Sequence, residues 1–494
     1  MPPASTGAAT ITVVASPQPS PVADASNSSD SSGTAQTADA DSDPGPAGSG
    51  SAEAGSTARA EAGPAAPVRR EPSGHQSGRH ERDRHEPDRL EPGRPGYRRM
   101  SFALFAAGVA TFALLYSTQA LLPAVSASLG ATAGQASWTV SAATGALALC
   151  VLPLSALSER FGRRQMMTAS LAVAVLVGLL VPFAPSLGWL VALRAVQGAA
   201  LAGLPASAMA YLAEEVRPKA LVAAIGLFVA GNSIGGMSGR ILTGWIAQLW
   251  GWRAAVGAVG LLAAGCAVAF HFMIPKARNF TPGSLNPKAV ARTVAGHLAD
   301  PLLRRLFAIG ALFMTVFGAV YTVIGYRLVA APFNLPQGVV GSIFLVYLVG
   351  TVSSAAAGKL VARLGRRGAL YLAVSTTAAG LLLSLADTVA LVLLGLVLIT
   401  AGFFAGHAVA SSAVSRTATT GRAQASALYQ SAYYLGSSAG GTLGAVAFHA
   451  GGWGGTVSLG LLAVLGVVSV TLYGSRAARA TRTRPMAVAA AARG

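Results

Sequence analysis

Acidic residues are scarce in most of this chain of 494 residues. The first 97 positions hold 13 of the 18 Asp and Glu residues, which leaves 5 for the other 397 positions. Only 11% of the residues in the whole chain are charged, whereas roughly a quarter of the residues in soluble domains are charged. A body this apolar cannot cover a water-facing surface. A soluble enzyme and a disordered binding protein are therefore excluded for the part of the chain after residue 97.

Cysteine is also rare, and the two cysteines, Cys150 and Cys266, both lie inside apolar runs. They offer no disulfide framework and no metal-ligand spacing, so we predict no metal site. We interpret both as small hydrophobic side chains within helices. Lys and Arg are scattered between the apolar runs instead of forming a patch, so we predict no nucleic-acid partner.

Residues 1–97 differ from the rest in composition. They are rich in Ala, Ser, Pro, Gly and Asp, and later in Arg, His and Glu. Such a segment cannot bury enough apolar surface to offset the entropy of ordering, so we predict a disordered N-terminal cytoplasmic tail. It contains no apolar stretch behind basic residues, which excludes a secretory signal peptide. An alternative is that the protein starts at Met100 and that the tail is an upstream extension. Low-complexity drift explains the spacing of three histidines better than a metal tract does: His75, His80 and His85.

Long apolar runs fill the chain from residue 102 onward. Each is near 20 residues, the length that crosses a hydrocarbon core of about 30 Å at 1.5 Å per residue. In lipid these runs must be helices, because an open strand would leave backbone groups without partners. We therefore predict an all-α polytopic membrane protein with twelve transmembrane helices, at 102–122, 138–157, 166–183, 187–212, 221–247, 252–274, 306–330, 339–361, 369–385, 389–413, 423–448 and 457–473.

The cations fall on one set of loops. These loops and the C-terminal tail carry 22 Lys and Arg residues, whereas the alternate loops carry Arg253 alone. Because positive residues mark the cytoplasmic side, we predict that both termini are cytoplasmic. The expected location is the cell (plasma or inner) membrane, in which the chain is a multi-pass protein.

The two parts of the apolar region repeat each other. The segment 155–164 (SALSERFGRR) follows the second run, and the similar segment GKLVARLGRR follows the eighth run at an offset of 203. A second match, GNSIGG in the fifth run and GSSAGG in the eleventh, has an offset of 205. We thus predict two pseudo-symmetric six-helix halves. Parallel repeats of this kind place a substrate site between the halves, which rock to give alternating access. The predicted parts are the N-terminal half at 98–274, a cytoplasmic connector at 275–305, the C-terminal half at 306–474 and a cytoplasmic tail at 475–494.

Several motifs identify the chain as similar to the major facilitator superfamily over residues 100–474. The segment 155–164 resembles the family's loop signature Gly-x-x-x-Asp-Arg-x-Gly-Arg-Arg, with Ser155 for the Gly and Glu159 for the Asp. The fourth run contains Arg194-Ala-Val-Gln-Gly, which resembles the family motif Arg-x-x-Gln-Gly. The resemblance implies a fold of two six-helix halves and a transport function.

Two further segments resemble exporters of this family. Residues 231–236 are similar to the Gly-Pro-x-x-Gly-Gly signature of the fifth span, with Asn232 in place of the Pro. Residues 116–123 (YSTQALLP) resemble a bacterial inner-membrane efflux branch, the arabinose-efflux-permease-like one. The resemblance implies export of a small organic solute.

The loop at 155–164 also has a physical rationale. A tight turn at Gly162 brings Glu159 and several Arg residues together, where the carboxylate can meet a cation or the positive end of a helix from the other half. The resemblance implies that Glu159 and Arg163 act as a latch between access states, and the alternative is an anchor that only fixes topology. In the second copy Ala362 replaces the acid, so the latch is not symmetric. The latch candidates are Glu159, Arg160, Gly162, Arg163, Arg164, Gly358, Arg363, Gly365 and Arg366.

Arginines inside the runs are costly unless they have partners. Arg194 and Gln197 lie on one helix face, and Arg194 is roughly 10 Å deep at helical rise. It should therefore face a polar cavity or a partner, and the alternative is snorkelling to the outer interface. The resemblance implies a cavity or proton-coupling role for it. Arg240 and Arg327 fall nearer the outer ends of their runs, so we predict that both snorkel.

Glycines recur every four residues in the fifth and eleventh runs. Such small-residue stripes let helix backbones approach closely, so packing is the main role that we predict for them. The resemblance adds that a stripe in the fifth span is typical of exporters. The predicted helix-packing glycines are Gly231, Gly235, Gly236, Gly436 and Gly440.

Polar and aromatic residues inside the runs are candidates to line a substrate path. His407 is the only His well inside a run, and a His titrates near neutral pH. No carboxylate lies at the middle of a run, although embedded acids commonly serve in proton relays. Proton antiport would therefore use Glu159, His407 or the substrate's own proton, and the path should disfavour cationic drugs. The path candidates are Tyr116, Gln119, Arg194, Gln197, Asn232, Tyr321, Tyr326, His407, Gln430 and Tyr434.

The sequence as a whole predicts a secondary active transporter, a monomer in the bilayer that exports a drug, sugar or metabolite with proton coupling. No Gly-x-x-x-x-Gly-Lys-[Ser/Thr] motif occurs, which favours a gradient over ATP hydrolysis, and we predict no cofactor. Two alternatives are an uptake symporter for a small anion or sugar and a non-transporting, transporter-like membrane sensor. We do not predict an enzyme, because the runs hold no nucleophile with a base and no carboxylate pair.

Overall fold

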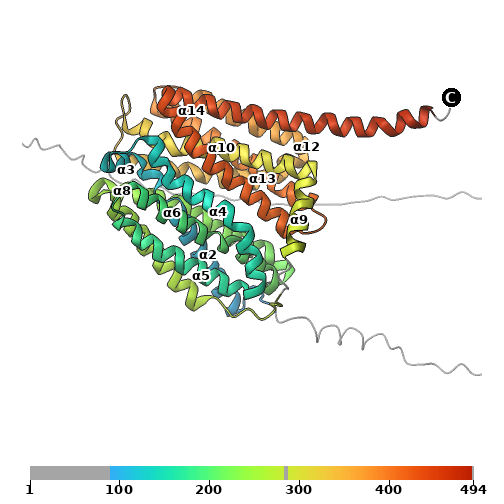
Figure 1. The fold of residues 1–494 in the computed structure, drawn as a ribbon, viewed down its shortest axis with the longest axis horizontal. Helices are drawn as coiled ribbons and strands as arrows, with labels where there is room; N and C mark the ends of the chain where they lie inside the picture. Colours follow the sequence, from blue (N-terminus) through green and yellow to red (C-terminus); the bar gives the residue numbers. More distant parts are fainter. Residues whose placement is uncertain (1–88, 283–286, 492–494) are drawn as a thin grey trace, which may run out of the picture. The chain divides into compact units, whose positions relative to one another are not determined.

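The computed structural model describes residues 89–282 and 287–491. Residues 74–494 group as one compact unit, and most of the predicted N-terminal tail, with its three histidines, lies outside the described residues. Within the described ranges every element is a helix (Figure 1), and the one extended pairing is an isolated bridge between Leu90 and Val216.

Residues 89–282 form nine helical elements, several of which are parts of one bent span. α2 ends at Leu115, and the short η2 and α3 continue the same span. The elements are α2 (Pro95–Leu115), η2 (Gln119–Leu121), α3 (Leu122–Leu129), α4 (Ala133–Phe161), α5 (Arg163–Leu180), η3 (Val181–Phe183), α6 (Leu187–Leu201), α7 (Gly203–Glu215) and α8 (Pro218–Met273).

The second half begins with a helix of the connector. α9 lies within the predicted connector, and the side chain of Asp300 then caps the N-terminus of α10 by accepting from the backbone N–H of Leu302 at 2.7 Å. The elements are α9 (Pro287–Ala299), α10 (Pro301–Val329), α11 (Gln337–Ser342), η4 (Ile343–Val346), α12 (Tyr347–Leu383), α13 (Val389–Thr417) and α14 (Arg422–Ala491).

Among the described residues, nine helical stretches are long and apolar enough to cross a membrane. Three of these stretches are interrupted by glycines outside helical φ/ψ: Gly251 in α8, Gly365 in α12 and the pair 451–452 in α14. Each interrupted stretch is therefore two crossings, which gives twelve in the described ranges at the positions of the apolar runs. The prediction of an all-α polytopic bundle is confirmed.

The sequence repeat is also a repeat of backbone geometry. Gly162 and Gly365, the equivalent glycines of the two loop segments, have φ of 98° and 69°. Gly251 and Gly452, which end the fifth and eleventh spans, have φ of 81° and 58°. A side chain disfavours this region of φ, so glycine is required where the chain reverses between consecutive spans.

Each half has a hydrophobic core of its own. One core is built from residues 100–274 with Tyr434 added, and the other from residues 303–467 with Ala120 added. In each core the glycine stripe lies against the first span of its half, because a Cβ at Gly235 or Gly440 would overlap the carbonyl of Val109 or Thr315. The same holds for Gly231 against Phe105 and for Gly436 against Ala311.

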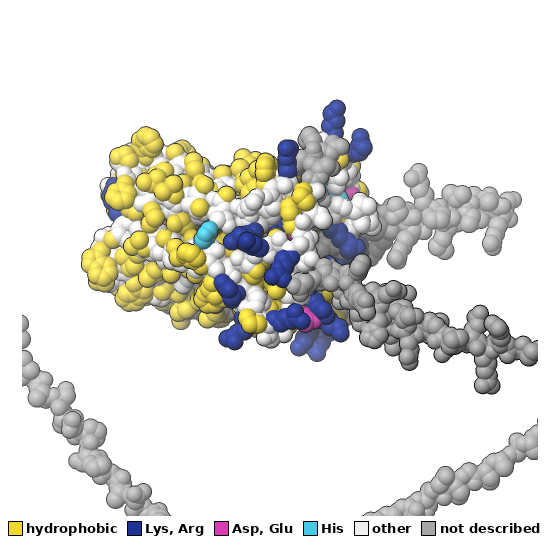
Figure 2. All heavy atoms as spheres, turned by 90° about the horizontal axis from the view of Figure 1, so that it is seen from below, with side chains coloured by type: hydrophobic (Ala, Val, Ile, Leu, Met, Phe, Trp, Pro, Cys, Tyr) yellow, Lys and Arg dark blue, Asp and Glu magenta, His cyan; other side chains and the backbone are white. Residues whose placement is uncertain are grey.

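Charge and apolar surface are separated on the described part of the molecule. In Figure 2 most visible Lys and Arg side chains gather toward one end, and hydrophobic side chains cover much of the rest. Large apolar side chains stand on the outside of the helices, such as Val222 at 80% and Phe272 at 71% exposed, as lipid contact requires. We call the end with the loops near residues 162, 217, 365 and 420 the basic end, and the other the opposite end.

The structure differs from the predicted boundaries at both termini. The backbone N–H of Leu90 donates to Glu215 at 2.7 Å, and Glu91 forms an ion pair with Arg217 at 2.6 Å. Residues 89–97 thus contact the bundle instead of belonging to a disordered tail, and α2 begins at Pro95. At the other terminus α14 continues to Ala491, so the backbone of the predicted tail extends the last helix.

Candidate functional site

The two halves are joined at the opposite end. The hydroxyls of Ser126 and Tyr326 lie 2.6 Å apart, and the hydroxyl of Tyr326 also donates to the carbonyl of Leu122 at 2.9 Å. The amide of Gln337 donates to the carbonyl of Ala120. These residues lie close to the turns at Gly130 and 330–336, far from the basic loops in the chain.

The fifth and eighth spans form a second joint. Trp245 in α8 donates its indole N–H to Ser342 at 2.9 Å, and Gln248 accepts from the backbone N–H of Gly338 at 2.8 Å. α4 and α14 form a third, in which Ser438 donates to the carbonyl of Ser141 at 2.8 Å. Among the described residues, no hydrogen bond or ion pair between side chains of the two halves lies at the basic end.

The contacts described above between the two halves together form what we call the junction, and Arg240 lies in the middle of it. It is 2% exposed, and its guanidinium carbon lies 4.2 Å from the ring centre of Tyr116, 4.8 Å from Phe344 and 4.9 Å from Tyr347. Its Nε donates to the side chain of Gln119 at 2.8 Å. The prediction that Arg240 snorkels is wrong, because the aromatic rings of both halves and the glutamine enclose the charge inside the bundle.

Arg194 lies inside the N-terminal half and is fully buried. Its Nε donates to the carbonyl of Thr139 at 3.0 Å, and its two amino nitrogens donate to the carbonyls of Leu114 and Leu115 and to Gln197. Gln197 in turn donates to the carbonyl of Ala174 at 3.0 Å. Arg194 thus supplies donors at the C-terminus of α2, to the carbonyl of Leu115 and to that of Leu114, which also accepts from Ser117.

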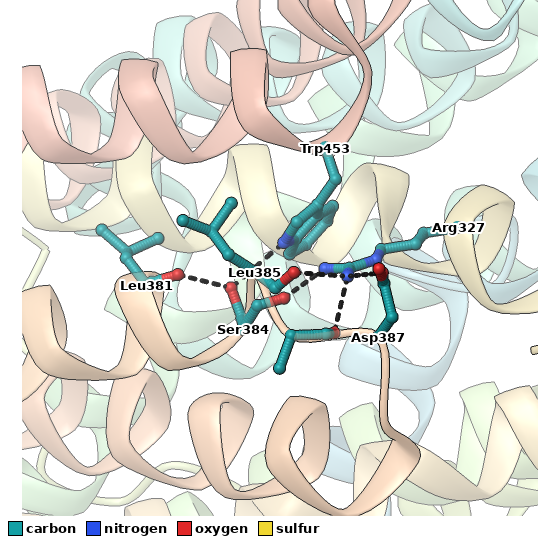
Figure 3. A network of polar contacts seen from close by, with 7 residues as sticks. Arg327, Leu381, Ser384, Leu385, Asp387 and Trp453 are labelled. Atoms are coloured by element: carbon teal, nitrogen blue, oxygen red, sulfur yellow. Dashed lines mark hydrogen bonds and ion pairs between the residues drawn. The ribbon is translucent and has the colours of Figure 1, made fainter. Parts of the chain in front are cut away.

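Arg327 has the same relation to a helix end in the other half (Figure 3). It donates to the carbonyls of Ser384, Leu385 and Ala386 after α12, and it pairs with Asp387 at 3.4 Å. The indole N–H of Trp453 donates to the hydroxyl of Ser384 at 3.1 Å from the other side. Arg327 reaches toward the opposite end as snorkelling requires, but its side chain is only 9% exposed and caps α12 instead of entering solvent.

A band of aromatic rings runs through the C-terminal half toward the junction. His407 lies within it, with Nδ1 2.9 Å from the hydroxyl of Tyr429 and its ring 4.7 Å from that of Tyr433. Tyr433 contacts Tyr434 at 5.0 Å, and Tyr434 packs into the core of the N-terminal half. His407 is partly exposed, and its Nε2 makes no hydrogen bond with the described residues.

The other path candidates divide between this band and helix contacts. The hydroxyl of Tyr321 lies 2.6 Å from that of Thr400, inside the C-terminal core. Asn232 faces α2, where its Oδ1 lies against Gly108 and has no hydrogen-bond partner among residues 89–282 and 287–491. Gln430 is partly exposed on α14. The structure therefore brings Tyr116 and Gln119 together at Arg240, and keeps Arg194 and Gln197 within one half.

The predicted latch lies at the basic end. Arg163 donates to Glu214 at 3.0 Å and to Ser158 at 2.7 Å, so its partners belong to its own half. Glu159 makes no hydrogen bond or ion pair with the described residues. Phe280 of the connector lies against Gly162. The second copy of the loop segment is exposed at all four of its candidate residues: Gly358, Arg363, Gly365 and Arg366.

Several residues of the junction were missed by the sequence analysis. Phe344 and Tyr347 are ordinary residues of the predicted eighth span, Gln337 lies just before that span, and no spacing rule marks any of them. Arg240 carried a signal, because an arginine inside an apolar run needs a partner. Among the described residues no group of His, Cys, Asp and Glu is close enough to hold a metal ion.

Twelve crossings in two repeated halves that meet at one end define a membrane protein of the secondary-transporter type. Residues 100–328 match the family model of the Major Facilitator Superfamily. The chain is 39% identical to the MFS-type transporter YybF of Bacillus subtilis over 77% of this chain and 94% of that protein. It is 40% identical to the inner membrane transport protein YnfM of Escherichia coli over 78% of this chain and 91% of that protein.

Solved structures share the fold. A bacterial homolog of the human lysosomal transporter Spinster, in an inward-facing and unoccupied conformation, has a TM-score of 0.61 at 13% identity and covers 77% of this chain and 96% of its own. A POT family transporter in complex with 5-aminolevulinic acid has a TM-score of 0.63 at 14% identity and covers 79% and 98%. The chain belongs to the major facilitator superfamily and is a membrane transporter, as the sequence motifs predicted.

Proposed function

We propose that the protein is a proton-coupled exporter of a small organic solute that works by alternating access and as a monomer. The observation that carries this proposal is that, among the described residues, the hydrogen bonds between the halves lie from the opposite end to the middle of the spans and not at the basic end. A transporter caught in one access state has its halves joined on one side of the substrate and apart on the other.

The proposed orientation of the protein in the membrane follows from the distribution of its positively charged residues. The basic end carries the Lys and Arg of the loops, and such loops stay on the cytoplasmic side. Both termini are then cytoplasmic, in a cell inner membrane, and the structure corresponds to a state that is closed toward the outside. A membrane-impermeant thiol reagent should label a cysteine at Arg363 only from the cytoplasmic side, and labelling from outside would contradict this orientation.

His407 is the residue that we propose to carry the coupling proton. It is partly exposed within the aromatic band, and Tyr429 holds its Nδ1 while Nε2 remains available. An imidazole with one anchored and one accessible nitrogen suits proton exchange. In proteoliposomes with an imposed pH gradient, His407→Gln should abolish gradient-driven flux but keep solute exchange without a gradient. Equal loss of both would mean a structural role.

Glu159 and Arg163 are proposed as the latch of the other state. Arg163 is held by Glu214 here, whereas Glu159 lacks a partner among the described residues and is free to bind a cation when the basic end closes. Glu159→Gln should therefore leave the thermal stability of this state unchanged and slow the transport cycle. Glu214→Gln, the matched change, should lower stability by less than about 1 kcal/mol, because the pair is partly exposed.

Locking the junction tests the proposal directly. In a variant without native cysteines, Ser126→Cys and Tyr326→Cys should be joined by a bifunctional thiosulfonate reagent that spans the gap left by the tyrosine ring, because the Tyr326 hydroxyl contacts Ser126 across the halves. Cross-linked protein should lose flux, and reduction of the same sample should restore it. Flux that persists in the cross-linked protein would rule out alternation at this junction.

An experiment in cells distinguishes the direction of transport and the alternative functions. Metabolites that accumulate in cells lacking the protein would support export, and metabolites that become depleted would support an uptake symporter for a small anion or sugar. No change in any metabolite would favour a non-transporting sensor.

A further inference from the structure

The charge of Arg240 is not neutralised by any carboxylate. The acids of the described residues all stand near helix ends or in loops, and none forms an ion pair with it. Its neighbours are a glutamine amide, a backbone carbonyl and three aromatic rings. Such groups tolerate a cation but leave its full charge available to an anion.

One amino nitrogen of Arg240 has N–H groups that make no hydrogen bond with the described residues, unlike those of the other two arginines inside the bundle. Arg194 and Arg327 use both amino nitrogens on carbonyls of their own half. Arg240 uses Nε on Gln119 and one amino nitrogen on Gly236, and its other amino nitrogen donates no hydrogen bond to the described residues. A guanidinium presents paired donors that match the two oxygens of a carboxylate.

Tyr347 supplies a second free group beside it. Its hydroxyl is buried and has no hydrogen-bond partner in the described part of the chain, although its ring is fixed by contacts with Tyr321 at 5.1 Å and Phe344 at 5.6 Å. A buried hydroxyl without a partner is unfavourable, and a ligand oxygen would relieve it. The ring lies 4.9 Å from the guanidinium carbon of Arg240, so one anion can reach both groups.

We propose that Arg240 and Tyr347 bind the carboxylate of an organic anion whose apolar body lies against Phe344 and Tyr116. This inference rests on the proposed function in one respect, since the anion is the transported solute. Arg240 and Tyr116 belong to the N-terminal half, and Phe344 and Tyr347 to the C-terminal half. Separation of the halves at the opposite end therefore parts the rings, uncovers both donors and exposes the site.

The chemistry of the site excludes other classes of solute. An organic cation meets a buried positive charge with no acid nearby to offset it, so binding is opposed. An inorganic anion is attracted by the guanidinium charge but makes no apolar contact with the aromatic rings. A neutral aromatic solute contacts the aromatic side chains but leaves the guanidinium and the Tyr347 hydroxyl unpaired, which strongly disfavours its binding at a site with polar donors.

Binding to the purified full-length protein tests this inference without requiring transport. The probes are benzoate and phenylacetate, each compared with its ring alcohol and its ring amine, with sulfate at equal ionic strength as the inorganic control. We expect titration calorimetry to show carboxylate binding at least about tenfold tighter than binding of the alcohol, amine or sulfate. Arg240→Gln should abolish the preference for the carboxylate.

Tyr347→Phe is the decisive variant, because it removes a hydroxyl that bonds to none of the described residues and should not impair folding. It should weaken benzoate binding by about tenfold, whereas Tyr371→Phe, the same change at a tyrosine outside the cluster, should have no effect. Equal binding of carboxylates and alcohols, or unchanged binding in Tyr347→Phe, would overturn the inference. Flux of a neutral solute that ignores Arg240 would overturn it and leave the transporter proposal intact, while carboxylate binding without flux would do the reverse.

Discussion

The hydroxyl of Tyr326 in α10 lies 2.6 Å from the hydroxyl of Ser126 in α3, so the first span of one half is tied to the first span of the other. The same hydroxyl reaches the carbonyl of Leu122 at 2.9 Å. Both contacts must break when the halves part at the opposite end, and they belong to the joined state alone.

Replacing Tyr326 by Phe should shift the protein toward the other access state. The change removes two hydrogen bonds, each worth about 0.5–1.5 kcal/mol, and keeps the ring. Distance measurements between spin labels at the opposite end should show a larger separated population. Tyr371→Phe serves as the control, and a distance distribution that does not move would mean that the bonds do not hold the halves.

The glycine stripe of α8 can be tested with a matched pair in one helix. A Cβ at Gly235 would overlap the carbonyl of Val109, whereas a Cβ at Gly226 would meet nothing. Gly235→Ala should cost about 1–3 kcal/mol of stability through forced separation from α2. Gly226→Ala should be neutral or stabilise by about 0.5–1 kcal/mol, since alanine favours helix. Thermal unfolding in detergent compares them, and similar shifts in both would contradict close packing as the role of the stripe.

Arg194→Met should reduce the amount of folded protein before it affects transport. Removal of the guanidinium leaves the buried carbonyl of Leu115 and the amide oxygen of Gln197 without their donor, while Leu114 keeps its bond from Ser117, and each lost donor costs about 1–3 kcal/mol. Thermal stability and the yield of monodisperse protein measure this loss, with the exposed Arg160→Gln as control. A stable Arg194→Met protein that no longer transports would instead support a direct role in the substrate path.

Truncation of the N-terminus should show a sharp dependence on the last residue removed. Deletion of residues 1–88 keeps the Leu90 bridge and the pair of Glu91 with Arg217, so stability and flux should be retained. Deletion of residues 1–94 removes both contacts and should lower the melting temperature. Loss of flux on deletion of 1–88 alone would favour a signalling function of the tail.

The crossings and the glycine turns could be predicted from the sequence because both follow from local rules. A 20-residue apolar run can only be a helix in lipid, and the repeats at Gly162 and Gly365 mark equivalent turns. The packing of the Gly235 stripe needed only the four-residue spacing. These features depend on neighbours along the chain, and one sequence contains that information.

The junction could not be predicted because it depends on residues that are distant in the chain. The depth of Arg240 in its run suggested snorkelling, but the side chain turns inward to rings contributed by spans one and eight. Similarly, Arg163 pairs with Glu214, which is 51 residues away in the chain. The binding of Leu90 to Val216 is a backbone contact and leaves no pattern in the side chains.

The connector is divided between the two halves. Its first residues are held by the N-terminal half, where Glu215 accepts from the backbone N–H groups of Arg278 and Asn279 at 2.8 Å. α9 is held by the C-terminal half, where His297 contacts the carbonyl of Gly421 at 3.1 Å. In the proposed cycle each half therefore carries its own portion of the connector. The number of residues between these two anchorages then sets an upper limit on how far the halves can separate at the basic end.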